Sequence, residues 1–130
     1  MGELAQRAAY VLATLLFVIT GIHAYWALGG RWGLQIAIGE GNPLPSSPLI
    51  WLGTAAFFAA GLTVLGRVGA WGASLPTWIF WLGPWVLAVV FLGGAAVNLT
   101  GSRLWAPFVF APAFFLLSVL AVAVAWWAPR

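Results

Sequence analysis

The chain has 130 residues, of which 64% are hydrophobic and only 5% are charged. A soluble domain has about 45 to 50% apolar and about 25% charged residues, so the composition excludes a water-soluble globule. The chain contains no cysteine, which excludes disulfides and thiolate metal sites. The net charge is +3, but the arginines are scattered along the chain rather than clustered, so we expect no nucleic-acid partner.

The charged residues divide the chain into four long apolar intervals. Each interval can hold one membrane span of about 20 residues. We predict spans near residues 8–28, 48–66, 77–97 and 106–127. The apolar runs do not alternate with polar residues, which favours helices over a β-barrel. The predicted fold is all-α: a single polytopic membrane domain, residues 1–130, with four transmembrane helices in an antiparallel bundle.

The first loop, residues 29–47, is longer than the other two. It contains the apolar stretch 34–38, followed by a segment rich in glycine and proline. We expect a short amphipathic or re-entrant piece at the membrane surface, and then a shaped loop. Further along the chain, Pro84 and Pro112 lie inside apolar runs and are expected to kink the third and fourth spans.

The arginines give a preferred orientation. An even number of spans places both termini on one side of the membrane. With the N-terminus inside, Arg7, Arg67 and Arg130 are cytoplasmic, whereas Arg31 and Arg103 are outside. The positive-inside rule therefore predicts cytoplasmic termini, and it places the long first loop on the outer side.

His23 is the only histidine, and it lies about 7.5 Å inside the end of the first predicted span at 1.5 Å per residue. An ionisable side chain at that depth is a candidate functional site, because burial in lipid is costly without a partner. The alternative is a neutral imidazole that caps a helix or bridges helices through one hydrogen bond.

Other polar and aromatic side chains are predicted on the same side of the membrane as His23. These candidate ligand-binding residues are Tyr25, Trp26, Arg31, Trp32, Glu40, Asn98 and Arg103. If the helices form one bundle, they converge on a pocket with an apolar floor and a polar, aromatic rim. The structural alternative is a salt bridge from Glu40 to Arg31 or Arg103 that joins two loops.

The sequence predicts neither a metal site nor a cofactor. One histidine without cysteine or neighbouring acids cannot supply the three or four ligands that zinc usually takes. The two glutamates lie near the N-terminus and in a loop, so no buried carboxylate pair is expected for acid and base chemistry. No glycine-rich phosphate loop is found.

The segment 21–33, GIHAYWALGGRWG, resembles the end of the first helix in a family of small bacterial four-helix membrane proteins classified as a domain of unknown function. That family carries the signature His-x-Tyr-Trp-Ala-x-Gly-Gly-x-Trp-Gly, which is complete here. The segment 103–108, RLWAPF, is similar to the family's entry into the fourth helix, which more often reads Tyr-Ser-Pro-Leu followed by Cys.

The resemblance implies four spans in a bacterial cytoplasmic (inner) membrane, and no particular activity, substrate or cofactor. It groups His23, Tyr25 and Trp26 with Arg31 and Trp32 as one unit. The two glycines between these groups are then expected to end the helix, so that the chain folds back over the mouth of the bundle.

Three functions follow as expectations. The first is binding of a lipid-like or other hydrophobic small molecule in an outer-side pocket around His23. The alternative is an accessory or assembly subunit, whose small-residue helix faces bind a second copy or a larger membrane protein. The third is a lipid-modifying enzyme with His23 as base. We expect binding rather than catalysis, with membrane lipids as partners.

Overall fold

The computed structural model describes residues 2–101 and 105–129, and all secondary structure in these residues is helical. The elements in chain order are α1 Gly2–Ala27, α2 Leu34–Ile38, α3 Ser47–Arg67, α4 Thr77–Thr100, the π-helix η1 Ala106–Phe110 and α5 Ala111–Trp127. Four segments are long and apolar enough to cross a membrane: α1, α3, α4, and η1 together with α5. The predicted all-α bundle of four transmembrane helices is confirmed.

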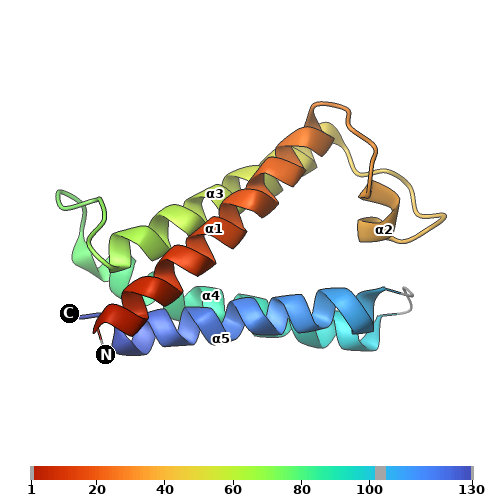
Figure 1. Ribbon diagram of the computed structural model, residues 1–130. Coiled ribbons are helices and arrows are strands. Elements are labelled where there is room, and N and C mark those ends of the chain that lie inside the picture. Colours follow the sequence, from red (N-terminus) through yellow and green to blue (C-terminus); the bar gives the residue numbers. More distant parts are fainter. Residues whose placement is uncertain (1, 102–104, 130) are drawn as a thin grey trace.

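The four long helices form two pairs that diverge like the arms of a V (Figure 1). Helix α1 packs mainly on α3, and α4 packs mainly on α5. The pairs touch each other through α1 with α5 and through α3 with α4. Both termini lie at the closed end of the V, and α2 lies at the open end (Figure 1).

A compact apolar core holds the closed end together. Its buried members come from all four long helices, and they are Ala9, Leu12, Ala13, Leu16, Ala60, Val64, Ala88, Phe91, Leu117, Ala121 and Val124. Five of these eleven residues are alanines, and small side chains let helices approach closely in lipid, where packing contacts drive association. Beyond this core the two pairs separate (Figure 1).

Arg67 ties the two pairs together at the closed end. It is the last residue of α3, and its Nη1 donates to the Pro129 carbonyl at 2.9 Å. Its Nη2 donates to the carbonyls of Ala128 at 3.1 Å and Ala125 at 3.4 Å. The last carbonyls of a helix have no intrahelical partner and carry partial negative charge. The guanidinium therefore caps α5, a role beyond the topology signal expected from the sequence.

The prolines act differently in the two helices. Helix α4 continues through Pro84, which is fully buried. Before Pro112 the chain instead widens into the π-helix η1, in which the Ala111 N–H donates to the Ala106 carbonyl five residues back. Proline has no N–H and its ring clashes with the preceding turn, so the wider turn accommodates it.

Two helices extend beyond the predicted spans. Helix α1 begins at Gly2 rather than near residue 8, and the added N-terminal segment carries an exposed ion pair between Glu3 and Arg7, 3.5 Å apart at the i, i+4 spacing of a helix. Helix α4 runs on to Thr100 rather than 97, and the Thr100 hydroxyl donates to the Ala96 and Val97 carbonyls at 3.2 Å.

Candidate functional site

The end of α1 is shaped by a pair of glycines. The Gly29 N–H donates to the Trp26 carbonyl at 3.0 Å, and the Gly30 N–H donates to the Tyr25 carbonyl at 2.9 Å. Gly29 has a φ of 101°, which residues with a side chain rarely adopt. Together these features form a Schellman motif, which ends the helix where the sequence predicted.

Two aromatic side chains of α1 hold the turn that follows. The Trp26 indole Nε1 donates to the Trp32 carbonyl at 2.8 Å, and the Trp32 N–H donates to the Tyr25 hydroxyl at 3.4 Å. The backbone at Trp32 therefore folds back onto α1. The Trp32 indole is 83% exposed, however, so it points away from the bundle rather than over its mouth.

Substitution of Gly30 by alanine is expected to break this turn. An added Cβ would overlap the Tyr25 ring, so the ring must move and its contacts with the turn are lost. We expect a loss of about 1 to 3 kcal/mol in the free energy of unfolding, measured by reversible unfolding in bicelles. The matched control is Gly21→Ala in the same helix, where a Cβ meets nothing within 4 Å and stability should hold or rise. Equal effects of the two changes would contradict this account.

The short helix α2 is flanked by two further glycines of left-handed φ, Gly33 at 75° and Gly39 at 93°. The Ala37 N–H donates to the Gly33 carbonyl at 3.1 Å, and the Asn42 amide donates to the Ile38 carbonyl at 2.7 Å. These bonds provide partners for backbone groups at the two ends of the short helix. The short amphipathic or re-entrant piece expected at 34–38 is a single helical turn at the open end of the V (Figure 1).

The His23 side chain is held in a defined orientation. Its Nδ1 lies 2.9 Å from the Ile19 carbonyl oxygen. The ring contacts Phe57 and Trp26, with centroids 4.9 and 5.2 Å away. A Cβ added at Gly53 of α3 would lie 3.2 Å from the His23 Cδ2, so the absence of a side chain at this position makes room for the imidazole. These contacts join α1 to α3.

Two cavities meet at His23. The larger has a volume of about 500 Å³ and lies between the two helix pairs, lined by Ile19, Ile22, His23, Trp26, Ala37, Phe57, Asn98, Val109, Phe110, Ala113, Phe114 and Leu117. The smaller has a volume of about 260 Å³ and lies among α1, α2 and α3, lined by His23, Trp26, Leu34, Ala37, Ile38, Pro45, Leu49, Ile50 and Gly53. The cavities share His23, Trp26 and Ala37, so a molecule could contact both.

The structure brings together three of the residues singled out in the sequence. His23, Trp26 and Asn98 all line the larger cavity. Asn98 is buried near the end of α4, and its amide nitrogen donates to the Gly94 carbonyl at 2.8 Å. These side chains come from both helix pairs, so the site exists only when the pairs are assembled.

Four other candidates do not line either cavity. These residues, Tyr25, Arg31, Trp32 and Glu40, are exposed. The Tyr25 hydroxyl accepts a hydrogen bond from the turn that follows α1 and does not line a cavity. No ion pair joins Glu40 to Arg31 within the described part of the chain, where the recorded pair is Arg7 with Glu3. Arg103 lies outside the described residues.

Sequence reasoning missed most of the apolar lining. Ile19, Ile22, His23 and Trp26 recur at the spacing of one helix face, and Phe110 and Phe114 are four residues apart. These spacings are visible in the sequence, but they do not reveal which faces oppose each other. That pairing depends on the assembled bundle.

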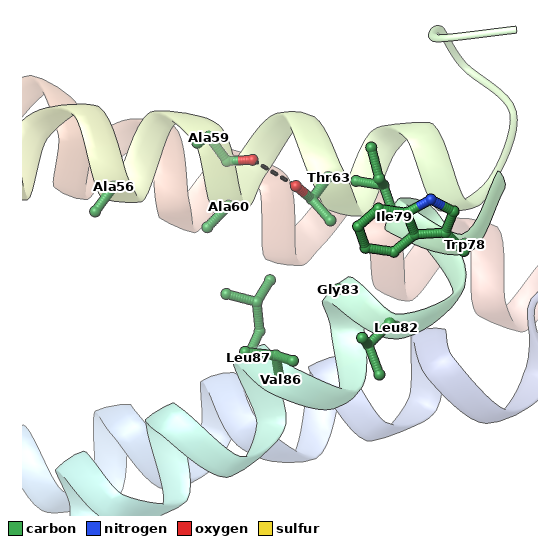
Figure 2. A pocket seen from close by; sticks show the side chains of 10 residues that line it. All are labelled: Ala56, Ala59, Ala60, Thr63, Trp78, Ile79, Leu82, Gly83, Val86 and Leu87. Atoms are coloured by element: carbon green, nitrogen blue, oxygen red, sulfur yellow. Dashed lines mark hydrogen bonds between the residues drawn. The ribbon is translucent and has the colours of Figure 1, made fainter. Parts of the chain in front are cut away.

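A second groove runs between α3 and α4, with a volume of about 450 Å³ (Figure 2). Small residues of α3 form one wall, with Thr63 close to Gly83 of α4. The Thr63 hydroxyl donates to the Ala59 carbonyl at 2.8 Å (Figure 2), so its proton is already used. Apart from Thr63, the residues that line this groove are apolar, aromatic or glycine. The polar side chains that could orient a ligand, His23 and Asn98, line the larger cavity instead.

Comparison with protein-family models, with curated proteins and with solved structures finds no match to this chain. Within the residues that the structure describes, no group of three His, Asp or Glu side chains is placed to hold a metal ion.

Proposed function

We propose that this protein binds a lipid-like or other hydrophobic small molecule between its two helix pairs, around His23. The supporting observation is a cavity of about 500 Å³ whose lining is apolar except for a few groups that include His23 and Asn98. Small-molecule sites are typically about 300 to 1,000 Å³, mostly apolar, with a few placed polar groups that set specificity. The cavity has these properties.

The shape of the bundle gives the ligand a place to bind. The closed end is filled by the alanine-rich core and fixed by Arg67. At the open end, Ile22 and Trp26 of α1 line the cavity together with Phe110 and Phe114 across the V. An apolar molecule dissolved in the bilayer would gain close contacts on both sides.

In the proposed arrangement the open end of the V and α2 lie at the outer side of a bacterial inner membrane, with both termini cytoplasmic. The arginine distribution supports this orientation. The complete signature ending in Gly33 supports the bacterial family assignment.

Photolabelling of the purified protein in bicelles tests the proposal. The probe is a long-chain hydrocarbon that carries a diazirine and no polar head group. Labels on cavity residues such as Phe57 and Phe114 should saturate with probe concentration, and excess unlabelled hydrocarbon should displace them. Labels on exposed α4 residues such as Val89 and Leu92, which are 71% and 52% exposed, should rise in proportion to the probe.

Proportional labelling at all of these positions would overturn the proposal. Recovery of a stoichiometric protein partner by cross-linking in native membranes, together with that result, would favour the accessory-subunit function instead.

A further inference from the structure

The proton on His23 can be assigned from its hydrogen bond. A carbonyl oxygen only accepts hydrogen bonds, so the 2.9 Å contact with the Ile19 carbonyl requires that Nδ1 carries a hydrogen. In the neutral imidazole, Nε2 then bears a lone pair and acts as an acceptor. The helix backbone therefore fixes which ring nitrogen is available to a ligand.

The Nε2 edge of the ring lies beside Gly53 of α3, which lines the smaller cavity. A Cβ built on Gly53 would lie 3.7 Å from Nε2 and 3.2 Å from Cδ2, and Gly53 lines the smaller cavity beside α2. Phe57 and Trp26 contact the ring at centroid distances of 4.9 and 5.2 Å. These aromatic contacts limit the directions from which a ligand can reach Nε2.

The smaller cavity suits a compact, uncharged head group. Apart from His23, its described lining consists of the apolar or aromatic side chains of Trp26, Leu34, Ala37, Ile38, Pro45, Leu49 and Ile50, together with Gly53. A phosphate or carboxylate placed among these side chains would lose its hydration without gaining a partner of opposite charge, which is costly. A single hydroxyl needs only one acceptor, and Nε2 supplies it.

We infer that the ligand is an uncharged long-chain alcohol, or another lipid whose only head group is a hydroxyl. Its O–H donates to Nε2 of His23 in the smaller cavity, and its apolar chain lies in the larger cavity between the helix pairs. This inference rests on the proposed function and specifies the class of ligand. It predicts that lipids whose head group donates a hydrogen bond bind more tightly than lipids whose head group can only accept one.

Competition against the photolabel tests the class of ligand separately from the proposed binding of a hydrophobic molecule. Hexadecan-1-ol should displace the diazirine hydrocarbon about tenfold more effectively than hexadecyl methyl ether, because the ether has no O–H group to donate to Nε2. Phosphatidylglycerol should compete no better than the ether. The variant His23→Phe keeps an aromatic ring between Trp26 and Phe57 and should lose the preference for the alcohol.

A spectroscopic measurement on the unmodified chain provides an independent test. The chain has one histidine, so labelling with ¹⁵N-histidine gives signals from His23 alone. We expect a protonated Nδ1, with an unprotonated Nε2 whose resonance shifts when hexadecan-1-ol is added and not when the ether is added.

The outcomes are separable. Saturable labelling with equal competition by alcohol and ether would overturn the inference and leave the proposed function standing. A proton on Nε2 rather than Nδ1 would also overturn it. An absence of saturable labelling would overturn the proposed function itself.

Discussion

Replacement of Ala113 by tryptophan is expected to reduce ligand binding at least tenfold. Ala113 lies near the start of α5 and lines the larger cavity, opposite His23 and Trp26 of α1. An indole at this position would occupy much of the 500 Å³ space. Helix packing should change little, because Ala113 is exposed within the open end of the V. Saturable photolabelling of Phe57 and Phe114 measures the loss.

The matched control is Ala96→Trp. Ala96 is an exposed alanine of α4 that lines neither cavity. This variant should retain wild-type labelling, since its added indole faces the surrounding lipid. If the two variants retained ligand equally well, the ligand would not lie in the cavity between the helix pairs.

Truncation of Leu16 to alanine is expected to have the largest effect on stability. Leu16 is completely buried in the core at the closed end, where α1 meets residues of α3, α4 and α5. Removal of the side chain leaves a cavity and loses many dispersion contacts. We expect the free energy of unfolding to fall by about 2 to 3 kcal/mol, measured by reversible unfolding in bicelles.

The control for this change is Val18→Ala, two residues along the same helix. Val18 is 55% exposed and faces away from the bundle, so lipid chains can replace the lost contacts and the effect should stay below about 1 kcal/mol. Similar losses for the two variants would show that the closed end does not depend on tight packing.

The membrane-spanning architecture could be predicted from the sequence with useful accuracy. The predicted spans 48–66 and 106–127 agree with α3 and with η1 plus α5 to within one residue at each end. The reason is that the bilayer sets the minimum length of an apolar span, and charged residues are excluded from its interior. The end of α1 could also be predicted from the sequence, because the turn there requires a glycine at the residue with a φ of 101°, Gly29.

The candidate site was predictable only in part. His23 and Asn98 were found because polar residues within a span are few, and Trp26 was found because it lies in the signature beside His23. Tyr25, Arg31, Trp32 and Glu40 were grouped with them by their common side of the membrane, but lying on one side does not fix the direction of a side chain. The exposed Trp32 indole shows this, since only the backbone at that residue folds back onto α1.

The sequence by itself determined that the helices suit a lipid environment, how many spans there are and where the one histidine lies along its span. These features depend on composition and on the lengths of the apolar segments. The tertiary structure decided how the helices pair and that the pairs diverge toward α2. It also decided that Arg67 caps α5 across the closed end, and that the His23 Nε2 edge faces α3. These features depend on which small and large side chains meet across helices that are distant in sequence, and no local pattern specifies that pairing.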